Sequence, residues 1–205
     1  MKKITLLIIL ASFALVSCKK DEKNKIPSSE WISINGVKWA IRNVDLPGAF
    51  VLKPEDAGMF YQWNTKTGWS SKDPLVNSDG GTTWDDNIPS GSNWVRANNP
   101  CPSGWRLPTK GELESLVNSG STWTDDYEGV SGRVFGNGEQ ELFFPAASFR
   151  YGGGGSLNNT GNIGYYWSGT YFNSGNAYFM CLSSESAKVL YNVRSGGLSV
   201  RCVVE

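Results

Sequence analysis

The amino-acid sequence predicts an α+β domain with one main helix and many short, mostly antiparallel strands joined by long loops. Helix signals are concentrated at residues 109–119, whereas short apolar segments separated by glycine or asparagine recur through much of the chain. The chain contains 24 glycines, 9 tryptophans and 8 tyrosines. We therefore expect a domain with many turns and a large aromatic content.

The first 17 residues resemble a secretory signal peptide. Lys2 and Lys3 precede an apolar run that is too short to cross a hydrocarbon core of about 30 Å as a helix. The segment Leu-Val-Ser-Cys then ends at Cys18 and matches a lipobox. We expect Cys18 to become the lipidated first residue of the mature chain, held on a membrane by its acyl chains. An ordinary signal peptide cut nearby is the alternative.

Residues 18–30 predict a lipidated, flexible tether, because this polar segment lacks the aromatic residues needed to bury a core. The run Lys20-Asp21-Glu22 resembles the surface-export signal of Bacteroidetes lipoproteins. It predicts an outer membrane lipoprotein exposed on the cell surface, and a generic tether on a lipoprotein facing the periplasm is the alternative.

Residues 31–205 predict a single domain, long enough to bury about 70% of its unfolded-chain surface. Without Lys2 and Lys3 the chain carries 17 basic and 19 acidic residues, a net charge of −2. This balance indicates no nucleic-acid partner.

The first elements of the domain are strands. Asn35-Gly36 lies between two segments of alternating apolar residues and predicts a hairpin. In residues 66–100 the apolar residues follow neither a helical nor a strand period. This segment predicts a long loop region held by its tryptophans.

Thr109 and Glu112 form the pattern of a capping box, and Leu113, Leu116 and Val117 follow at helical spacing up to Gly120. This pattern predicts the main helix. Further strands are expected at 142–149, 165–172, 177–182, 188–193 and 198–204.

Five segments, taken in order, resemble the Fibrobacter succinogenes major paralogous domain. They are Trp39 to Asn43, Gly58 to Trp63, the run CPSGWRLPT at 101–109, Gly164 to Ser168, and Ser199 to Val203. That family is common in Bacteroidetes lipoproteins and is similar to the C-type-lectin and formylglycine-generating-enzyme fold. The resemblance implies a C-type-lectin-like fold, with the last strand beside the early elements and a ligand face made of long loops.

Lipidation of Cys18 would leave an odd number of cysteines for pairing, namely Cys101, Cys181 and Cys202. The resemblance implies a Cys101–Cys202 disulfide, which an oxidising envelope compartment favours. Cys181 would then stay single. A formylglycine-generating-like enzyme is the alternative, but such enzymes hold copper with a cysteine pair near their C-terminal end. Here that region offers Cys181 and Cys202, which do not match the family pattern.

The chain has no histidine, which removes Ser-His-Asp relays, Cys-His pairs and histidine metal triads. We therefore expect no enzyme activity and no cofactor except calcium, which accepts oxygen ligands on irregular loops. Asp125, Asp126 and Glu128 are the weak calcium candidates, and their spacing does not match an EF-hand.

Two segments could bind a sugar, which needs an exposed aromatic ring beside amides, carboxylates or arginine. They are Trp84 with Asp85, Asp86 and Asn87, and Tyr151 with Arg150, Asn158 and Asn159. Loops 66–100 and 150–164, with 121–139 as a third, are expected to form the ligand face. The sequence thus predicts a cell-surface binding or adhesion module for carbohydrate or a protein partner. A structural envelope component with no small ligand is a further alternative.

Overall fold

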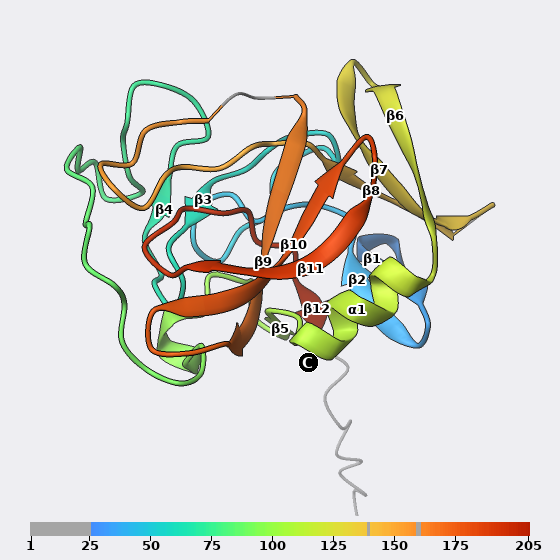
Figure 1. Cartoon of the computed structure of the whole chain (residues 1–205). Helices are drawn as coiled ribbons and strands as arrows, with labels where there is room; N and C mark the ends of the chain where they lie inside the picture. Colours follow the sequence, from blue (N-terminus) through green and yellow to red (C-terminus); the bar gives the residue numbers. More distant parts are fainter. Residues whose placement is uncertain (1–25, 139, 159–160) are drawn as a thin grey trace, which may run out of the picture.

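The strands are mostly antiparallel and accompany one α-helix in the computed structural model, which describes residues 26–138, 140–158 and 161–205 (Figure 1). The signal peptide, the lipidation at Cys18 and the export signal lie outside the described residues. No helix within the described ranges is long and apolar enough to cross a membrane.

Two three-residue 3-10 helices and the first strands cover the N-terminal half of the chain. They are η1 (Ser28–Glu30), β1 (Trp31–Ile34), β2 (Val37–Ala40), β3 (Phe60–Tyr61), β4 (Gly68–Trp69), η2 (Arg96–Asn98) and β5 (Trp105–Arg106). The helix α1 (Lys110–Asn118) follows. The remaining strands are β6 (Ser121–Tyr127), β7 (Val130–Asn137), β8 (Gln140–Pro145), β9 (Ile163–Tyr171), β10 (Asn176–Ser183), β11 (Ala187–Val193) and β12 (Val203–Val204).

The described strands form sheets of order β1-β2-β12-β5, β11-β10-β9, β6-β7-β8 and β3-β4. The predicted hairpin at Asn35-Gly36 is confirmed as β1 and β2, and both turn residues have positive φ. The last strand returns between early ones, because Val203 is the partner of both Trp39 and Arg106.

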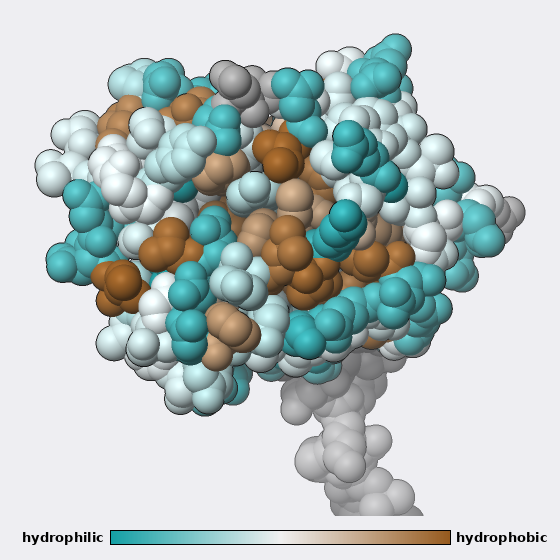
Figure 2. Space-filling view, viewed as in Figure 1, coloured by the Kyte–Doolittle hydropathy of each residue, from teal (hydrophilic) through white to brown (hydrophobic). Residues whose placement is uncertain are grey.

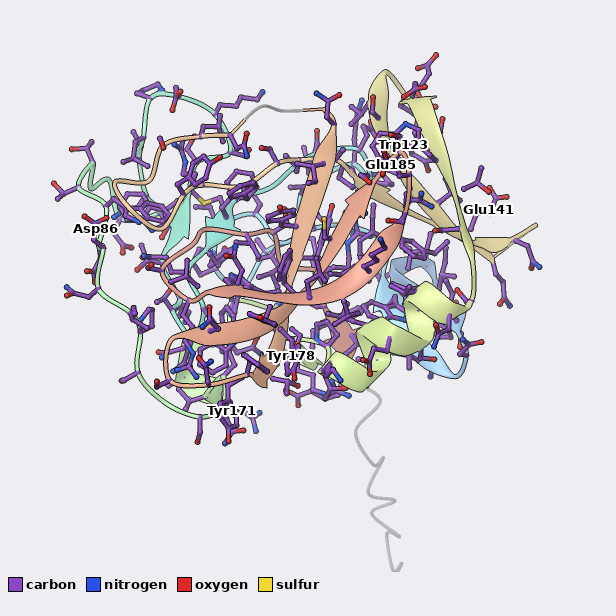
Figure 3. The ribbon with its side chains drawn as sticks, viewed as in Figure 1. Asp86, Trp123, Glu141, Tyr171, Tyr178 and Glu185 are labelled. Atoms are coloured by element: carbon purple, nitrogen blue, oxygen red, sulfur yellow. A yellow bond between two sulfur atoms is a disulfide. The ribbon has the colours of Figure 1, made fainter. Side chains whose placement is uncertain are left out.

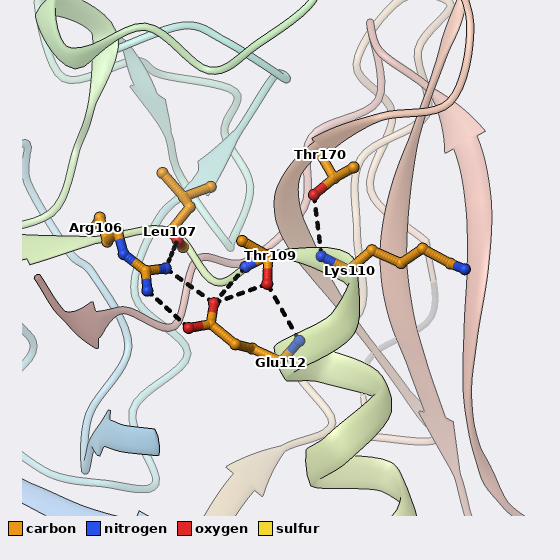
Figure 4. Close-up of polar contacts among 6 residues, drawn as sticks. All are labelled: Arg106, Leu107, Thr109, Lys110, Glu112 and Thr170. Atoms are coloured by element: carbon orange, nitrogen blue, oxygen red, sulfur yellow. Dashed lines mark hydrogen bonds and ion pairs between the residues drawn. The ribbon is translucent and has the colours of Figure 1, made fainter. Parts of the chain in front are cut away.

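The capping box of α1 is confirmed (Figure 4). Thr109 Oγ1 accepts a hydrogen bond from the Glu112 amide at 3.2 Å, and the Glu112 carboxylate accepts one from the Thr109 amide at 2.7 Å. The Arg106 guanidinium also donates to both carboxylate oxygens. Burial alone would raise the pKa of Glu112, but these hydrogen bonds outweigh it and lower the pKa. The N-terminus of α1 is thus stabilised by hydrogen bonds to the ionised carboxylate of Glu112.

The β9–β11 sheet is the middle layer of the domain. On one face, Tyr166 and Met180 pack with Leu113 and Leu116 of α1. On the other face, Trp167 and Phe179 belong to a second cluster, which contains Tyr61, Trp63 and Phe149. Neighbouring residues of one strand therefore serve two different cores.

The predicted disulfide joins Cys101 to Cys202, with Cα atoms 6.1 Å apart and a sequence separation of 101. It links the segment before α1 to the C-terminal segment. Cys181 is the free cysteine among the described residues and is half-buried in β10. Burial raises the pKa of its thiol, so Cys181 is a weak nucleophile.

Three boundary predictions need correction. The tether ends earlier than residue 30, because Ile26 packs against the core and Glu30 forms an ion pair with Arg42. The expected loop at 121–139 is largely the β6–β7 hairpin, which turns at Glu128 and Gly129, both with positive φ.

The expected strand at 198–204 forms a ladder only at its end. Leu198 exchanges backbone hydrogen bonds with Tyr61, whereas Ser199 bonds with β9. The Val200 carbonyl accepts a hydrogen bond from the amide of Val44. Successive residues thus have different neighbours, and no continuous pair forms before Val203.

Candidate ligand-binding cleft

Trp84 is not the exposed platform that the sequence predicts. Its side chain is only 7% exposed, its ring centroid lies 4.8 Å from that of Trp69, and its Nε1 donates to the Gly152 carbonyl at 3.1 Å. Gly155 and Gly197 lie so close that a Cβ on either would be within 2.5–2.7 Å of the indole. Two distant glycines therefore create the space into which Trp84 packs.

The polar neighbours of Trp84 are exposed, but they brace the loops. Asp85 Oδ1 accepts hydrogen bonds from the amide and side chain of Asn87. Asp86 Oδ1 accepts one from the Gly154 amide at 2.6 Å. The predicted site around Trp84 is thus a contact between loops 66–100 and 150–155.

Arg150 is also internal, with 1% of its side chain exposed. Its guanidinium donates to the carbonyls of Ser70, Lys72 and Gly155 at 2.7–2.8 Å and to Asp73 Oδ1 at 3.2 Å. Because its donors are committed to loop backbone, Arg150 organises the loops and is not available to a ligand.

Tyr151 keeps the exposure that a binding residue needs, with 49% of its surface accessible. Its hydroxyl accepts a hydrogen bond from Asn158 Nδ2 at 3.3 Å. Asn159, the last member of this predicted set, lies outside the described residues. Of the second predicted set, Tyr151 is thus exposed and in contact with Asn158, and their binding role stays a prediction.

A cleft of about 320 Å³ lies between Tyr151 and β11, and we call it the β11 cleft. Its lining includes Phe149, Tyr151, Tyr165, Leu190, Tyr191 and Asn192. The rings of Phe149 and Tyr165 stack with centroids 4.4 Å apart, and Tyr151 meets Phe149 edge-on at 5.0 Å. The wall of the cleft is thus made of aromatic rings that pack against one another.

The residues that β11 contributes to the cleft are not among the predicted site residues. Leu190 and Tyr191 are adjacent residues, yet 45% and 57% of their surfaces are exposed. A strand with one solvated face would bury one of two adjacent residues. The consecutive apolar pair in an edge strand is the signal that could have revealed the cleft.

The lining of the cleft has no acidic side chain, and its one arginine is Arg150. Burial raises the pKa of Tyr165, so its hydroxyl stays neutral at physiological pH. The cleft therefore offers ring faces and uncharged hydrogen-bonding groups, a chemistry suited to binding.

The three calcium candidates are not gathered into a site. Asp125 Oδ1 accepts a hydrogen bond from Trp123 Nε1 at 2.6 Å, and Asp126 Oδ1 accepts one from the Gly129 amide. Within the described ranges, no three or more histidine, cysteine or acidic residues are grouped to hold a metal ion. Figure 3 places Trp123 on the side of the view opposite Asp86, so the hairpin and the Trp84 loop form separate surfaces.

Two larger hollows differ from the cleft in their chemistry and position. One, of about 560 Å³, includes Arg106 and the C-terminal Glu205. The other, of about 590 Å³, includes the carboxylates of Glu55, Asp56 and Asp73. Both therefore contain acidic groups that the β11 cleft lacks.

No family model, curated protein or solved structure gives a significant match to this chain.

Proposed function

We propose that this protein is a lipid-anchored cell-surface binding or adhesion module and that its β11 cleft binds carbohydrate. The observation that carries the proposal is the exposed ring of Tyr151, hydrogen-bonded to Asn158, on a wall of stacked rings from Phe149 and Tyr165 that also borders Asn192. A pyranose has an apolar face that packs on aromatic rings and hydroxyls that bond to amides. The one charged lining residue, Arg150, is buried and bonded to loop carbonyls, so the cleft suits a neutral sugar.

We assign the chain a C-type-lectin-like fold, a proposal supported by where the five resembling segments lie. Trp39 belongs to β2, Trp63 follows β3, and Trp167 belongs to β9. The segment that contains Cys202 returns beside the first hairpin. This return is the feature that the resemblance implies for the last strand.

The position of Ile26 favours the β11 cleft over the hollow beside Glu205 as the ligand site. The first described residue, Ile26, lies within 4 Å of the Cβ position of Gly104, and the Gly104 carbonyl accepts a hydrogen bond from the Glu205 amide. On a chain lipidated at Cys18, the hollow beside Glu205 would therefore lie near the membrane. The cleft, which is formed by other segments, would stay accessible.

The cysteines do not support a formylglycine-generating-like enzyme. Cys202 is bonded to Cys101, and Cys181 is the free cysteine of the described chain. A copper site made of two thiolates is therefore not assembled from Cys181 and Cys202. The binding module is the function that the geometry supports best.

A glycan array, run with and without calcium, tests the proposal with matched variants. Tyr151→Ala should weaken binding at least about tenfold, because interface aromatics often contribute about 2 kcal/mol or more. Tyr171→Ala is the control, since Tyr171 is 44% exposed but lines the hollow beside Glu205. Equal losses in both variants, or no glycan bound by the wild type, would reject the cleft as a carbohydrate site. A structural envelope component would then be the better interpretation.

Lipidation is tested separately from glycan binding. Cys18→Ala should leave an unprocessed precursor and abolish fatty-acid labelling. Surface display predicts that protease added to intact cells removes the wild-type protein, and that changing Asp21 and Glu22 to alanine protects it. Unchanged labelling of the Cys18 variant would refute the lipid anchor, whereas full protection of the wild type would refute surface display.

A further inference from the structure

β11 is an edge strand: on one of its two sides, no other strand pairs with it in the described part of the chain. It pairs with β10 along its whole length, from Ala187 with Leu182 to Val193 with Asn176, and stands at the end of its sheet. It is the strand nearest the viewer in Figure 1. Exposed edges usually carry several charges, a proline or a covering segment. β11 has one charged residue, Lys188, and no proline.

Hollows flank this edge on both faces of the sheet. The β11 cleft lies on one face, next to Leu190 and Asn192. A second hollow, of about 430 Å³, is lined by Val117 of α1 and by Lys188 and Val189. Figure 2 shows apolar residues gathered in a band over β11, above the polar outer surface of α1. Strand addition requires such a free edge, because main-chain hydrogen bonds hold the added strand.

We propose that the occupant of this edge is β11 of a second copy of the protein, paired antiparallel about a twofold axis at Leu190. In this register Leu190 faces its own copy, Val189 faces Tyr191, and Lys188 faces Asn192. Each pair is apolar with apolar or cation with amide. A register centred on Lys188 would oppose two ammonium groups, which is unfavourable. The side-chain chemistry of β11 therefore favours the Leu190 register over the Lys188 register.

The pairing would join two three-stranded sheets into one continuous sheet. Because opposed residues of an antiparallel pair lie on the same face, the two β11 cleft regions would open on the same side. Two linked sites bind a repeating polymer more tightly than one site does. This consequence depends on the proposed carbohydrate function, whereas the strand pairing does not.

Disulfide cross-linking of the full-length protein in the cell envelope tests the pairing. In a Cys181→Ser background, Leu190→Cys should give a covalent dimer, because opposed Cα atoms about 4.5–5.5 Å apart are within reach of a disulfide. Leu52→Cys is the control, since Leu52 is 87% exposed and lies outside β11. We expect at least about tenfold more dimer for Leu190→Cys, given that non-opposed cysteines more than about 7 Å apart cannot bridge.

The register is tested by mixing two variants. Val189→Cys and Tyr191→Cys should cross-link when produced together and much less when produced alone, because like positions would then be diagonal neighbours about 7–8 Å apart. Peptide mapping of the Cys101–Cys202 link checks that each variant is folded. Dimer no more abundant at position 190 than at 52, or Leu190→Cys linked to a different protein, would overturn the proposal. Neither outcome would bear on glycan binding.

Discussion

Two aromatic regions of this protein, the 66–100 loop and the β11 cleft, use their rings in opposite ways. Trp69 and Trp84 of the loop are buried, whereas Tyr151 and Tyr191 at the cleft are about half exposed. The loop has only the short β4 and η2 as regular structure, so buried rings and donated hydrogen bonds hold its backbone. At β11 the sheet already holds the backbone. The ring of Tyr191 can therefore face solvent without loss of folding, whereas Tyr151 lies in an irregular loop and is held edge-on against Phe149.

The comparison teaches that an aromatic residue in a polar, irregular loop is often a structural anchor. A ring on or beside the edge of a sheet is a better candidate for binding. Stability, hydrogen-exchange and pH measurements test this contrast.

The largest effect is expected for Trp84→Ala. Loss of a buried tryptophan should lower the free energy of unfolding by about 3–5 kcal/mol. Denaturant unfolding measures it, with Tyr151→Ala as the matched control, which should change stability by no more than about 0.5 kcal/mol. If the two variants were equally stable, the contrast between the regions would fail.

Cys202→Ser should follow, because the disulfide spans 101 residues and constrains the unfolded chain. A loss of about 2–5 kcal/mol in the free energy of unfolding is expected. The comparison variant is Cys181→Ser, which removes a thiol but no bridge. A Cys202→Ser protein as stable as Cys181→Ser would show that the scaffold does not depend on the bridge.

Arg150→Lys tests how the loop is held. An ammonium group cannot reproduce the planar fork that reaches Ser70, Lys72 and Gly155, and each carbonyl left unpaired costs about 1–3 kcal/mol. Asp73 is 72% exposed, so its ion pair with Arg150 adds little. Hydrogen exchange should speed up across residues 68–78 and remain unchanged in β9. Equally faster hydrogen exchange in residues 68–78 and in β9 would contradict a local role for Arg150.

High pH should destabilise the fold through its buried tyrosines. Burial raises the pKa of Tyr166 to about 12 and also raises that of Tyr61. The stability that these neutral tyrosines contribute is fully present below the ordinary tyrosine pKa of about 10. It is lost as the pH rises through their pKa in the folded protein. Arg201 acts in the opposite direction, since burial lowers its pKa to about 10. Unfolding midpoints between pH 9 and 12 should therefore fall less steeply for Tyr166→Phe than for the wild type. If the midpoints of the two proteins fell equally steeply with pH, Tyr166 would not be the cause of the loss.

The elements that sequence patterns predicted correctly are those encoded within a few residues. The Asn35-Gly36 hairpin needs a two-residue turn with positive φ, and α1 needs the Thr109–Glu112 box with apolar residues at helical spacing. The disulfide partners followed from a family resemblance. Local patterns alone left the choice among the three remaining cysteines open.

The candidate site could be predicted only in part. Tyr151 and Asn158 were identified because an aromatic ring beside amides is a local feature. Leu190 and Tyr191 were not, since their exposure depends on β11 lying at the edge of its sheet. Trp84 was placed in the wrong environment because Gly155 and Gly197, which make room for its ring, are distant in the chain.

The hairpin, the helix and the mixed α+β character follow from local sequence patterns, because turn chemistry, capping and periodicity act between near neighbours. Which aromatic rings are buried, and where the cleft lies, depends on tertiary packing. Burial is a property of the space between segments far apart in the chain. Arg150 shows the reason: its charge suggests a ligand contact, but the carbonyls of Ser70 and Lys72, some 80 residues away, surround it.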